Sequence, residues 1–340
     1  MFIKKFFLFF FLIFFIVGLL NYKISNNKLN LSKLNNLGNN LVNMRLLTLS
    51  RIDDFKVHNS IINRDNLPEI GLFGSHQISF LSPNNLKKNF MLHNYSYADF
   101  SLFDVLLYLK KLKKENLLPT KKLVIFIVTP NNDNGNLITT TSGQTFHIIN
   151  LKEIFLYNLS FNERLSIFKS FFIYYRNFFF NYQLTITHIK QLLNFNYLED
   201  PISTKNNCYY QHQSTKFLFL KSDGSFDHNC IKFELIKNNN NNNGRVFFNQ
   251  KDVVKLKYIL FRILDFASEN KLELIFVIPP VYEDERNTAA DNNFNLALKD
   301  LDNSIKIVDQ RELRFNHNFF LDYDHVSDKY LENLINNFIF

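Results

Sequence analysis

The chain has 340 residues, which is enough to bury a sizeable core in one large domain or two ordinary ones. It is rich in Phe, Lys and Asn and poor in Gly and Pro, a composition typical of AT-rich coding, so its formal charge of +8 is weak evidence for a polyanionic partner. The sequence carries no zinc-finger pattern, RNP motif or arginine cluster, and we therefore expect no nucleic-acid partner.

The N-terminus predicts a membrane anchor. Phe6–Leu20 is apolar and uncharged, and Lys4 and Lys5 precede it. At ~1.5 Å per residue the run is short for a bilayer core of ~30 Å, which suits an uncleaved signal anchor. We expect residues 1–22 to be this anchor and residues 23–66, which are rich in Asn and Lys, to form a membrane-proximal stalk. The remaining domain would be extracytoplasmic, on the periplasmic side of the inner membrane in a Gram-negative cell.

The first predicted strand ends in the best candidate for a nucleophile. Ile70–Phe73 is a short apolar run typical of a buried parallel strand, and Gly74, Ser75 and His76 follow it. In a chain with only 8 glycines, we expect Gly74 to lie where close approach of the backbone requires it. Two other interpretations remain open: Ser75 could cap the next helix, and His76 could be a hydrogen-bonded structural histidine.

A helix and a second strand come next. Apolar residues at helical spacing predict a helix over Leu102–Lys114, which Pro119 prevents from extending far. Leu123–Val128 is a continuous β-rich run and predicts the second strand. A turn cluster containing Asn131 and Asn132 follows that strand.

Residues 151–249 are expected to be a helical and loop-rich insertion. Ser160 and Glu163 fit a capping box that opens a helix, and the aromatic residues after it exceed one amphipathic face. That helix is either buried by its neighbours or rests on a membrane or partner. Cys208 and Cys230 lie in the same segment, where they form either a disulfide or two unrelated thiols, and no spacing suggests a metal site.

A regular alternation of predicted helices and strands then resumes and continues to the end of the chain. The pattern predicts a helix over Val253–Phe266, strands over Leu272–Ile278 and Ile305–Val308, and a closing helix over Lys329–Phe340. Because the strands read as apolar on both faces, the sequence predicts an α/β domain over residues 67–340 with a mainly parallel sheet and helices on both sides.

Polar groups follow the predicted strands and should converge at one rim of the sheet. In open α/β sheets, ligands bind beyond the carboxyl ends of the strands. Ser75 follows the first strand there, and Asp322 and His325 lie in one loop near the C-terminus. A hydroxyl, an imidazole and a carboxylate are what acyl transfer needs, without a metal or organic cofactor.

This arrangement resembles the SGNH hydrolase superfamily. The similarity lies in the Gly74-Ser75-His76 block, in the ending Asp322-Tyr323-Asp324-His325-Val326-Ser327, and in the Asn94–Asp104 and Leu118–Pro130 stretches. Within the superfamily, the chain looks most similar to membrane-anchored members that act on envelope polymers. These include relatives of alginate O-acetyltransferases and of the D-alanine transfer protein of teichoic acids. The resemblance implies a flavodoxin-like, three-layer αβα sandwich.

The resemblance also implies roles for individual residues. Ser75 would be the nucleophile, His325 the general base and Asp322 its orienting carboxylate, while Gly74 and Asn131 or Asn132 would help to hold the oxyanion. The acceptor would be an envelope polysaccharide or other polymer, and an integral-membrane acyltransferase is a possible partner. In another register His76 takes the nucleophile position, and Asp99 replaces the family's oxyanion glycine. These departures leave open a catalytically inactive module that binds or assembles beside a membrane acyltransferase.

Overall fold

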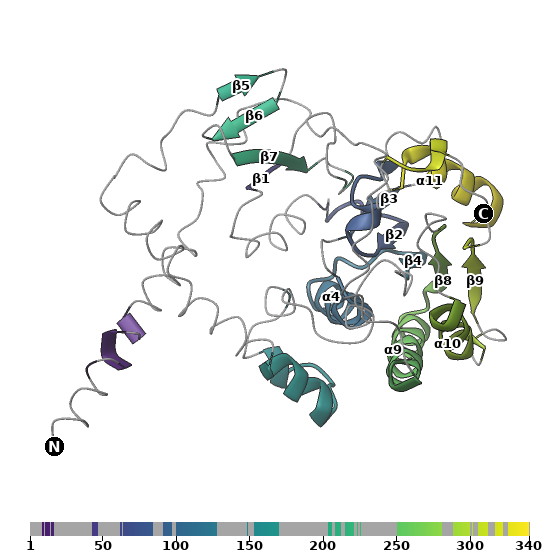
Figure 1. Cartoon of the computed structure of the whole chain (residues 1–340), viewed down its shortest axis with the longest axis horizontal. Coiled ribbons are helices and arrows are strands. Elements are labelled where there is room, and N and C mark those ends of the chain that lie inside the picture. The colour runs from purple at the N-terminus through teal and green to yellow at the C-terminus, as the bar shows by residue number, and fades with distance from the viewer. Residues whose placement is uncertain are drawn as a thin grey trace.

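The core of the protein is a five-stranded, entirely parallel sheet (Figure 1). The computed structural model describes residues 9, 11–13, 15–16, 43–46, 62, 64–83, 91–96, 100–127, 148, 153–169, 203–205, 208–211, 215–220, 223, 225, 250–280, 288–299, 301, 305–311, 317–321 and 326–339. The strand order is β3 (Leu92–Asn94), β2 (Ile70–Phe73), β4 (Lys122–Phe126), β8 (Glu273–Ile278) and β9 (Lys306–Asp309). Every neighbouring pair is parallel, so the carboxyl ends of all five strands lie at one edge.

Successive residues of the strands belong to two different hydrophobic clusters, as the twofold side-chain period of a strand requires. One cluster joins Phe73, Ile125 and Phe276 to α4 (Leu102–Lys114), α9 (Gln250–Glu269) and α10 (Thr288–Leu298). The other joins Leu72, Val124 and Ile275 to α11 (Asp328–Leu334) and to the π-helical turn Ile335–Ile339 that follows it. Strands buried in this way need continuous apolar sequence, which β2, β4 and β8 have. The expected α/β class is confirmed.

Local signals fix where two of the helices begin. Ser101 caps α4, and its side chain and that of Asp104 satisfy each other's backbone N–H groups as a capping box. The box predicted at Ser160 and Glu163 is also present: Glu163 Oε2 accepts from Ser160 N at 2.6 Å, and Glu163 N donates to Ser160 Oγ at 3.3 Å. A helix over residues 161–169 follows it.

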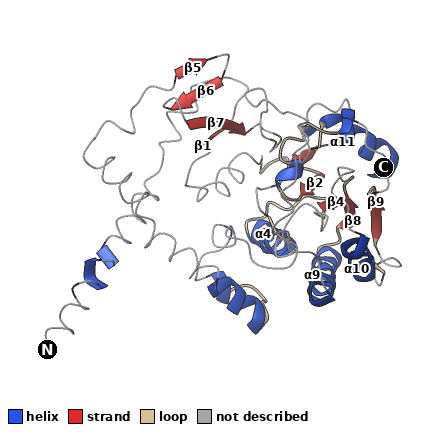
Figure 2. Cartoon of the chain, viewed as in Figure 1, coloured by secondary structure: helices blue, strands red, loops and turns tan. Residues whose placement is uncertain are grey.

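A second, antiparallel sheet has the strand order β1 (Asn43–Leu46), β7 (Thr215–Leu220), β6 (Cys208–Gln211) and β5 (Ser203–Lys205) (Figure 2). Strands β5, β6 and β7 belong to the segment expected to be a helical and loop-rich insertion. Strand β1 belongs to the segment expected to be a stalk, and it pairs with β7 through Asn43 opposite Leu220. The polar sequence before the domain therefore contributes a strand here.

Six residues of the apolar N-terminal run are described, at positions 9, 11–13 and 15–16, and they are helical with exposed side chains. Within the described parts of the chain, no helix has both the length and the apolarity needed to cross a bilayer.

Candidate functional site

Ser75 lies at the carboxyl edge of the sheet, two residues beyond the end of β2. Its carbonyl accepts from Ile78 N at 3.3 Å, which closes the 3-10 turn over His76–Ile78. The residue is only 4% exposed, and its Oγ has no hydrogen-bond partner. Ser75 therefore does not cap the turn that follows it, and the alternative interpretation of its hydroxyl as a helix cap is wrong. A buried hydroxyl without a partner is uncommon and calls for an explanation.

The glycines of this segment allow close packing. A Cβ added to Gly74 would lie 3.0 Å from Ile78 Cδ1 and 3.0 Å from Phe126 Cβ, tighter than most real contacts. The backbone at Gly74 therefore lies directly against β4 and against the turn after Ser75. This fits the expectation that the chain uses Gly74 where the backbone must approach closely.

Asn94, the last residue of β3, holds the segment after Ser75. Its side chain is fully buried, and its Nδ2 donates to Ile78 O at 2.7 Å and to Leu81 O at 3.0 Å. Its Oδ1 accepts from Ser96 N at 2.9 Å. One side chain thus ties the strand next to β2 to both ends of the segment from Ile78 to Leu81.

Asp223 fixes the same segment from a distant part of the chain. This buried residue accepts from Ser82 Oγ at 2.7 Å and, through its other carboxylate oxygen, from Ser225 Oγ at 2.6 Å and Ser225 N at 3.0 Å. Its carbonyl accepts from Asn94 N at 2.7 Å. The segment expected to be an insertion therefore contributes buried contacts to the rim of the sheet.

The C-terminal part of the chain also reaches the Ser75 turn. Val326 N donates to Gln77 O at 3.0 Å, and Asp328 Oδ1 accepts from Ser82 N at 2.7 Å. Phe320 and Val326 form an isolated antiparallel bridge. The residues on both sides of 322–325 therefore lie close to one another, and Val326 lies against the turn that begins at Ser75.

His93 lies beside this network on β3. Burial lowers the pKa of its imidazole to about 4, because the charged form loses its hydration, and the negative charge of Asp223 partly opposes that shift. Its ring centroid lies 4.6 Å from that of Tyr95, which in turn stacks on Phe73 at 4.7 Å. His93 is therefore a neutral, packed histidine at neutral pH.

Several predicted site residues lie outside the described residues. They are Asp322 and His325, Asn131 and Asn132, Asp99, and Cys230. His76 begins the turn after Ser75 and Cys208 begins β6, but for these two only the backbone is described. The structure therefore places Val326, the residue after His325, against the turn that follows Gly74 and Ser75, and it does not describe the other members of the predicted site.

Sequence reasoning missed Asn94, Ser82 and Asp223. Asp223-Gly224-Ser225 carries the signal of a turn in which an aspartate accepts from the backbone two residues on, which is what Asp223 and Ser225 do. Nothing in the local pattern indicates that this turn packs against β3.

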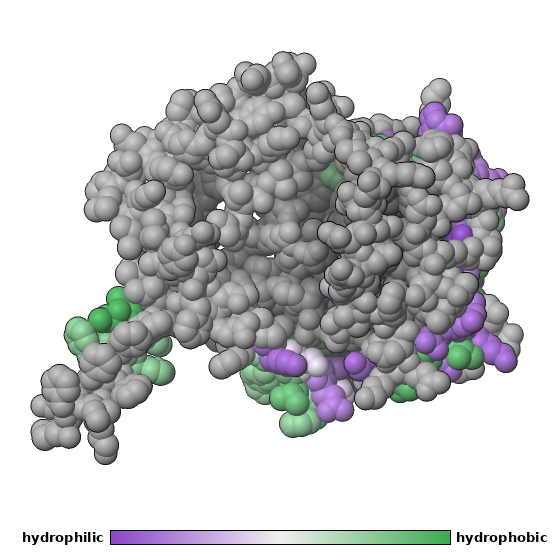
Figure 3. All heavy atoms as spheres, viewed as in Figure 1, coloured by the Kyte–Doolittle hydropathy of each residue, from purple (hydrophilic) through white to green (hydrophobic). Residues whose placement is uncertain are grey.

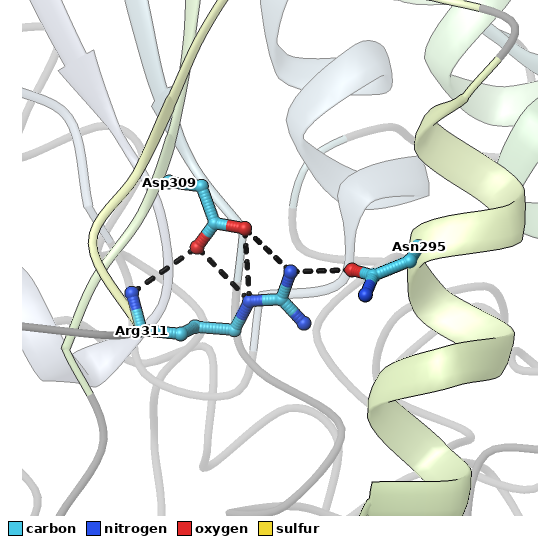
Figure 4. Close-up of polar contacts among 3 residues, drawn as sticks. All are labelled: Asn295, Asp309 and Arg311. Atoms are coloured by element: carbon cyan, nitrogen blue, oxygen red, sulfur yellow. Dashed lines mark hydrogen bonds and ion pairs between the residues drawn. The ribbon is translucent and has the colours of Figure 1, made fainter.

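The carboxyl end of β9 has a different role from the part of the sheet edge around Ser75 and residues 76–82, here named the Ser75 rim (Figure 4). Arg311 is buried, and its Nε and Nη2 donate to both carboxylate oxygens of Asp309, at 3.0 Å to Oδ1 and 2.5 Å to Oδ2. Nη2 also donates to Asn295 Oδ1 on α10, and the guanidinium lies 5.2 Å from the ring centroid of Phe294. Asp309 thus forms a bidentate ion pair with Arg311, and Arg311 in turn links β9 to Asn295 of α10. We interpret this arrangement as structural.

The chemistry open to the Ser75 rim is nucleophilic attack by a serine hydroxyl, provided that a base reaches it. In the part of the chain that the structure describes, no group of three or more His, Cys, Asp or Glu side chains could hold a metal ion. Compared with known proteins, the chain matches no protein-family model and no curated protein.

Proposed function

We propose that the protein is an extracytoplasmic esterase or O-acyltransferase that acts on an acylated envelope polymer through Ser75, His325 and Asp322. One observation carries this proposal: the hydrogen bond from Val326 N to Gln77 O, at 3.0 Å. It joins the residue after His325 to the residue two positions after Ser75. A base supplied by the C-terminal loop would then be within reach of a hydroxyl that has no other partner.

The reaction follows from the roles of these groups. Ser75 Oγ attacks the acyl carbonyl while His325 takes its proton, and Asp322 orients the imidazole and stabilises its charged form. Backbone N–H groups next to Gly74 and Ser75, with Asn131 or Asn132, hold the oxyanion. His325 then protonates the leaving alcohol, and water or a polymer hydroxyl attacks the acyl-enzyme to release the product.

The fold and the location belong to the same proposal. We assign the domain to a three-layer αβα sandwich of the flavodoxin-like type, supported by the strand order and by separate helix clusters on the two sets of strand residues. Residues 1–22 anchor it in the membrane, and residues 151–249 are an insertion. The acceptor is an envelope polysaccharide or similar polymer, and an integral-membrane acyltransferase supplies the acyl group.

Labelling with a fluorophosphonate tests the nucleophile, because this reagent bonds only to an activated serine hydroxyl. We expect the full chain to be labelled, and we expect Ser75→Ala and His325→Ala to abolish labelling. Ser96→Ala is the matched control: Ser96 follows the neighbouring strand β3, it is fully buried, and its Oγ also has no hydrogen-bond partner. Labelling that survives in Ser75→Ala, or is lost in Ser96→Ala instead, would contradict the proposal.

A specific observation favours a second candidate function, a non-catalytic binding or assembly module beside a membrane acyltransferase. Ser75 is only 4% exposed, and a serine that attacks a polymer must be reached by its substrate. If the protein is such a module, the wild-type chain should not be labelled, and cells that carry Ser75→Ala should acylate the envelope polymer fully. If the protein is the esterase or acyltransferase, cells that carry this variant should lose polymer acylation.

A further inference from the structure

The helix over residues 161–169 exposes apolar side chains. Phe161, Leu165 and Phe168 are 79%, 56% and 39% exposed and are spaced three and four residues apart, so they form one stripe. Just before the helix, Phe155 and Leu156 are 65% and 67% exposed. The rings of Phe155 and Phe168 lie 6.1 Å apart between centroids, which makes the five residues one surface, here named the aromatic patch.

The aromatic patch faces outward because the helix turns Glu163 and Ile167 towards the domain. Glu163 is buried, and its Oε1 lies 3.7 Å from Nε of Arg262 on α9. Nη2 of Arg262 also donates to the carbonyl of Asn158, just before the helix, at 2.9 Å. The helix therefore buries Glu163 together with Ile167, which is fully buried in the hydrophobic core, and it exposes its two phenylalanines. Figure 3 shows hydrophobic side chains in green at the lower margin of the molecule, where Figure 1 has this helix.

The charges beside the aromatic patch are positive. On the helix itself the cations are the half-buried Arg164, whose guanidinium lies 6.0 Å from the ring centroid of Phe155, and the exposed Lys169. Phenylalanine and leucine with cations at their margin are the composition of helices that lie in a membrane interface and attract anionic lipids. Exposed apolar surface of this kind marks an interaction site in a soluble domain.

The same chain has a second apolar segment that the protein does not bury. The described residues of the N-terminal run, Phe9, Phe11, Leu12, Ile13, Phe15 and Ile16, are all at least 43% exposed. A lipid bilayer would bury both this segment and the aromatic patch, and the positive charges complement its anionic headgroups. We propose that the aromatic patch rests in the interface of an anionic bilayer, so that the domain lies on the membrane as well as being tethered to it.

The absence of tryptophan allows a direct test, because a single introduced tryptophan reports its own surroundings. Full-length Phe161→Trp and Phe168→Trp would be reconstituted in vesicles of phosphatidylcholine and phosphatidylglycerol that contain brominated lipid. Met91→Trp is the control, since Met91 is 37% exposed and lies at the start of β3. We expect bromine to quench at least half of the emission of both patch variants and to leave that of the Met91→Trp variant unchanged.

Three further readouts decide between lipid and other occupants. We expect the quenching to fall at least twofold when phosphatidylglycerol is omitted, and to fall again in Phe161→Trp combined with Leu165→Ser and Phe168→Ser. Circular dichroism of each variant checks that the fold is kept. Absence of quenching in both patch variants would overturn the proposal. The proposal would also be overturned if the introduced tryptophans were protected from quenching by aqueous iodide to an extent that varies with the protein-to-lipid ratio, with no difference between brominated and ordinary lipid. A second copy or a protein partner would then cover the patch.

Discussion

At the scale of single residues, burial of His93 makes the stability of the domain depend on pH in a defined direction. Burial lowers the pKa of this imidazole from 6.5 in the unfolded chain to about 4. Between these two values the unfolded chain binds more protons than the folded one, so the stability falls as the pH drops from 6.5 towards 4. The pKa difference corresponds to about 3 kcal/mol at the acid end of this window.

We therefore expect His93→Gln to remove part of the acid sensitivity. The free energy of unfolding in urea would be measured at about pH 7 and at about pH 4.5 for both chains. The wild-type chain should lose more stability between these values than the variant, by roughly 2–3 kcal/mol, because glutamine has no proton to bind. Equal losses in the two chains would mean that His93 binds its proton as readily in the folded chain as in the unfolded one.

At the scale of elements, β2 is tightly packed and leads directly to the candidate nucleophile, Ser75. A Cβ added to Gly71 would lie 2.6 Å from Phe73 Cε2, 2.6 Å from Pro119 Cγ and 3.1 Å from Tyr95 Cε2. Phe73 and Tyr95 stack on each other and meet Tyr108 of α4 edge to face, so neither ring is free to move away. The strand is thus fixed on the face that it shares with α4.

We expect Gly71→Ala to destabilise the protein by about 1–3 kcal/mol through overpacking of these rings. Gly74→Ala is the matched comparison at the other end of the strand, where the nearest contacts of an added Cβ are 3.0 Å and the cost should be smaller. Urea unfolding of the two variants measures both values. A neutral Gly71→Ala would mean that Pro119 and its neighbours shift without cost.

The sequence predicts those elements whose pattern is carried by their own residues. The predicted strand Ile70–Phe73 and helix Leu102–Lys114 coincide with β2 and α4, and Leu272–Ile278 differs from β8 by one residue. Each has an uninterrupted apolar run or a helical period, which local reasoning detects.

Elements such as β3 and α10 escaped prediction because tertiary contacts create them. Strand β3 has three residues, Leu92, His93 and Asn94, with no apolar run, and it is a strand because it pairs with β2. Helix α10 is rich in Asn and Ala, and it is held by burial of Phe294 and Ala297. For the same reason, one part of the candidate site was predictable from the sequence and the other was not. The position of Ser75 follows from the strand that precedes it, whereas the contacts of Asn94 and Asp223 join distant segments that no local pattern connects.

At the scale of the whole molecule, the Ser75 rim is where three distant parts of the chain meet. Residues 76–82 receive contacts from Asn94 of β3, from Asp223, and from Val326 and Asp328 near the C-terminus. Of the residues just named, Asp223 comes from the segment between β4 and α9. Its carboxylate accepts hydrogen bonds from two serines in a buried setting, where removal of one partner leaves the others unsatisfied.

We therefore expect Asp223→Ala to destabilise the protein by about 1–3 kcal/mol and to loosen the segment 151–249 from the sheet. Urea unfolding measures the first effect, and limited trypsin digestion with mass spectrometry measures the second as faster cleavage within 151–249. Asp265→Ala is the control, because Asp265 is an exposed carboxylate on α9, and it should change neither. If Asp223→Ala digests like the wild-type chain, the buried hydrogen bonds of Asp223 do not hold this segment, and the rim must be fixed by β3 and the C-terminal residues alone.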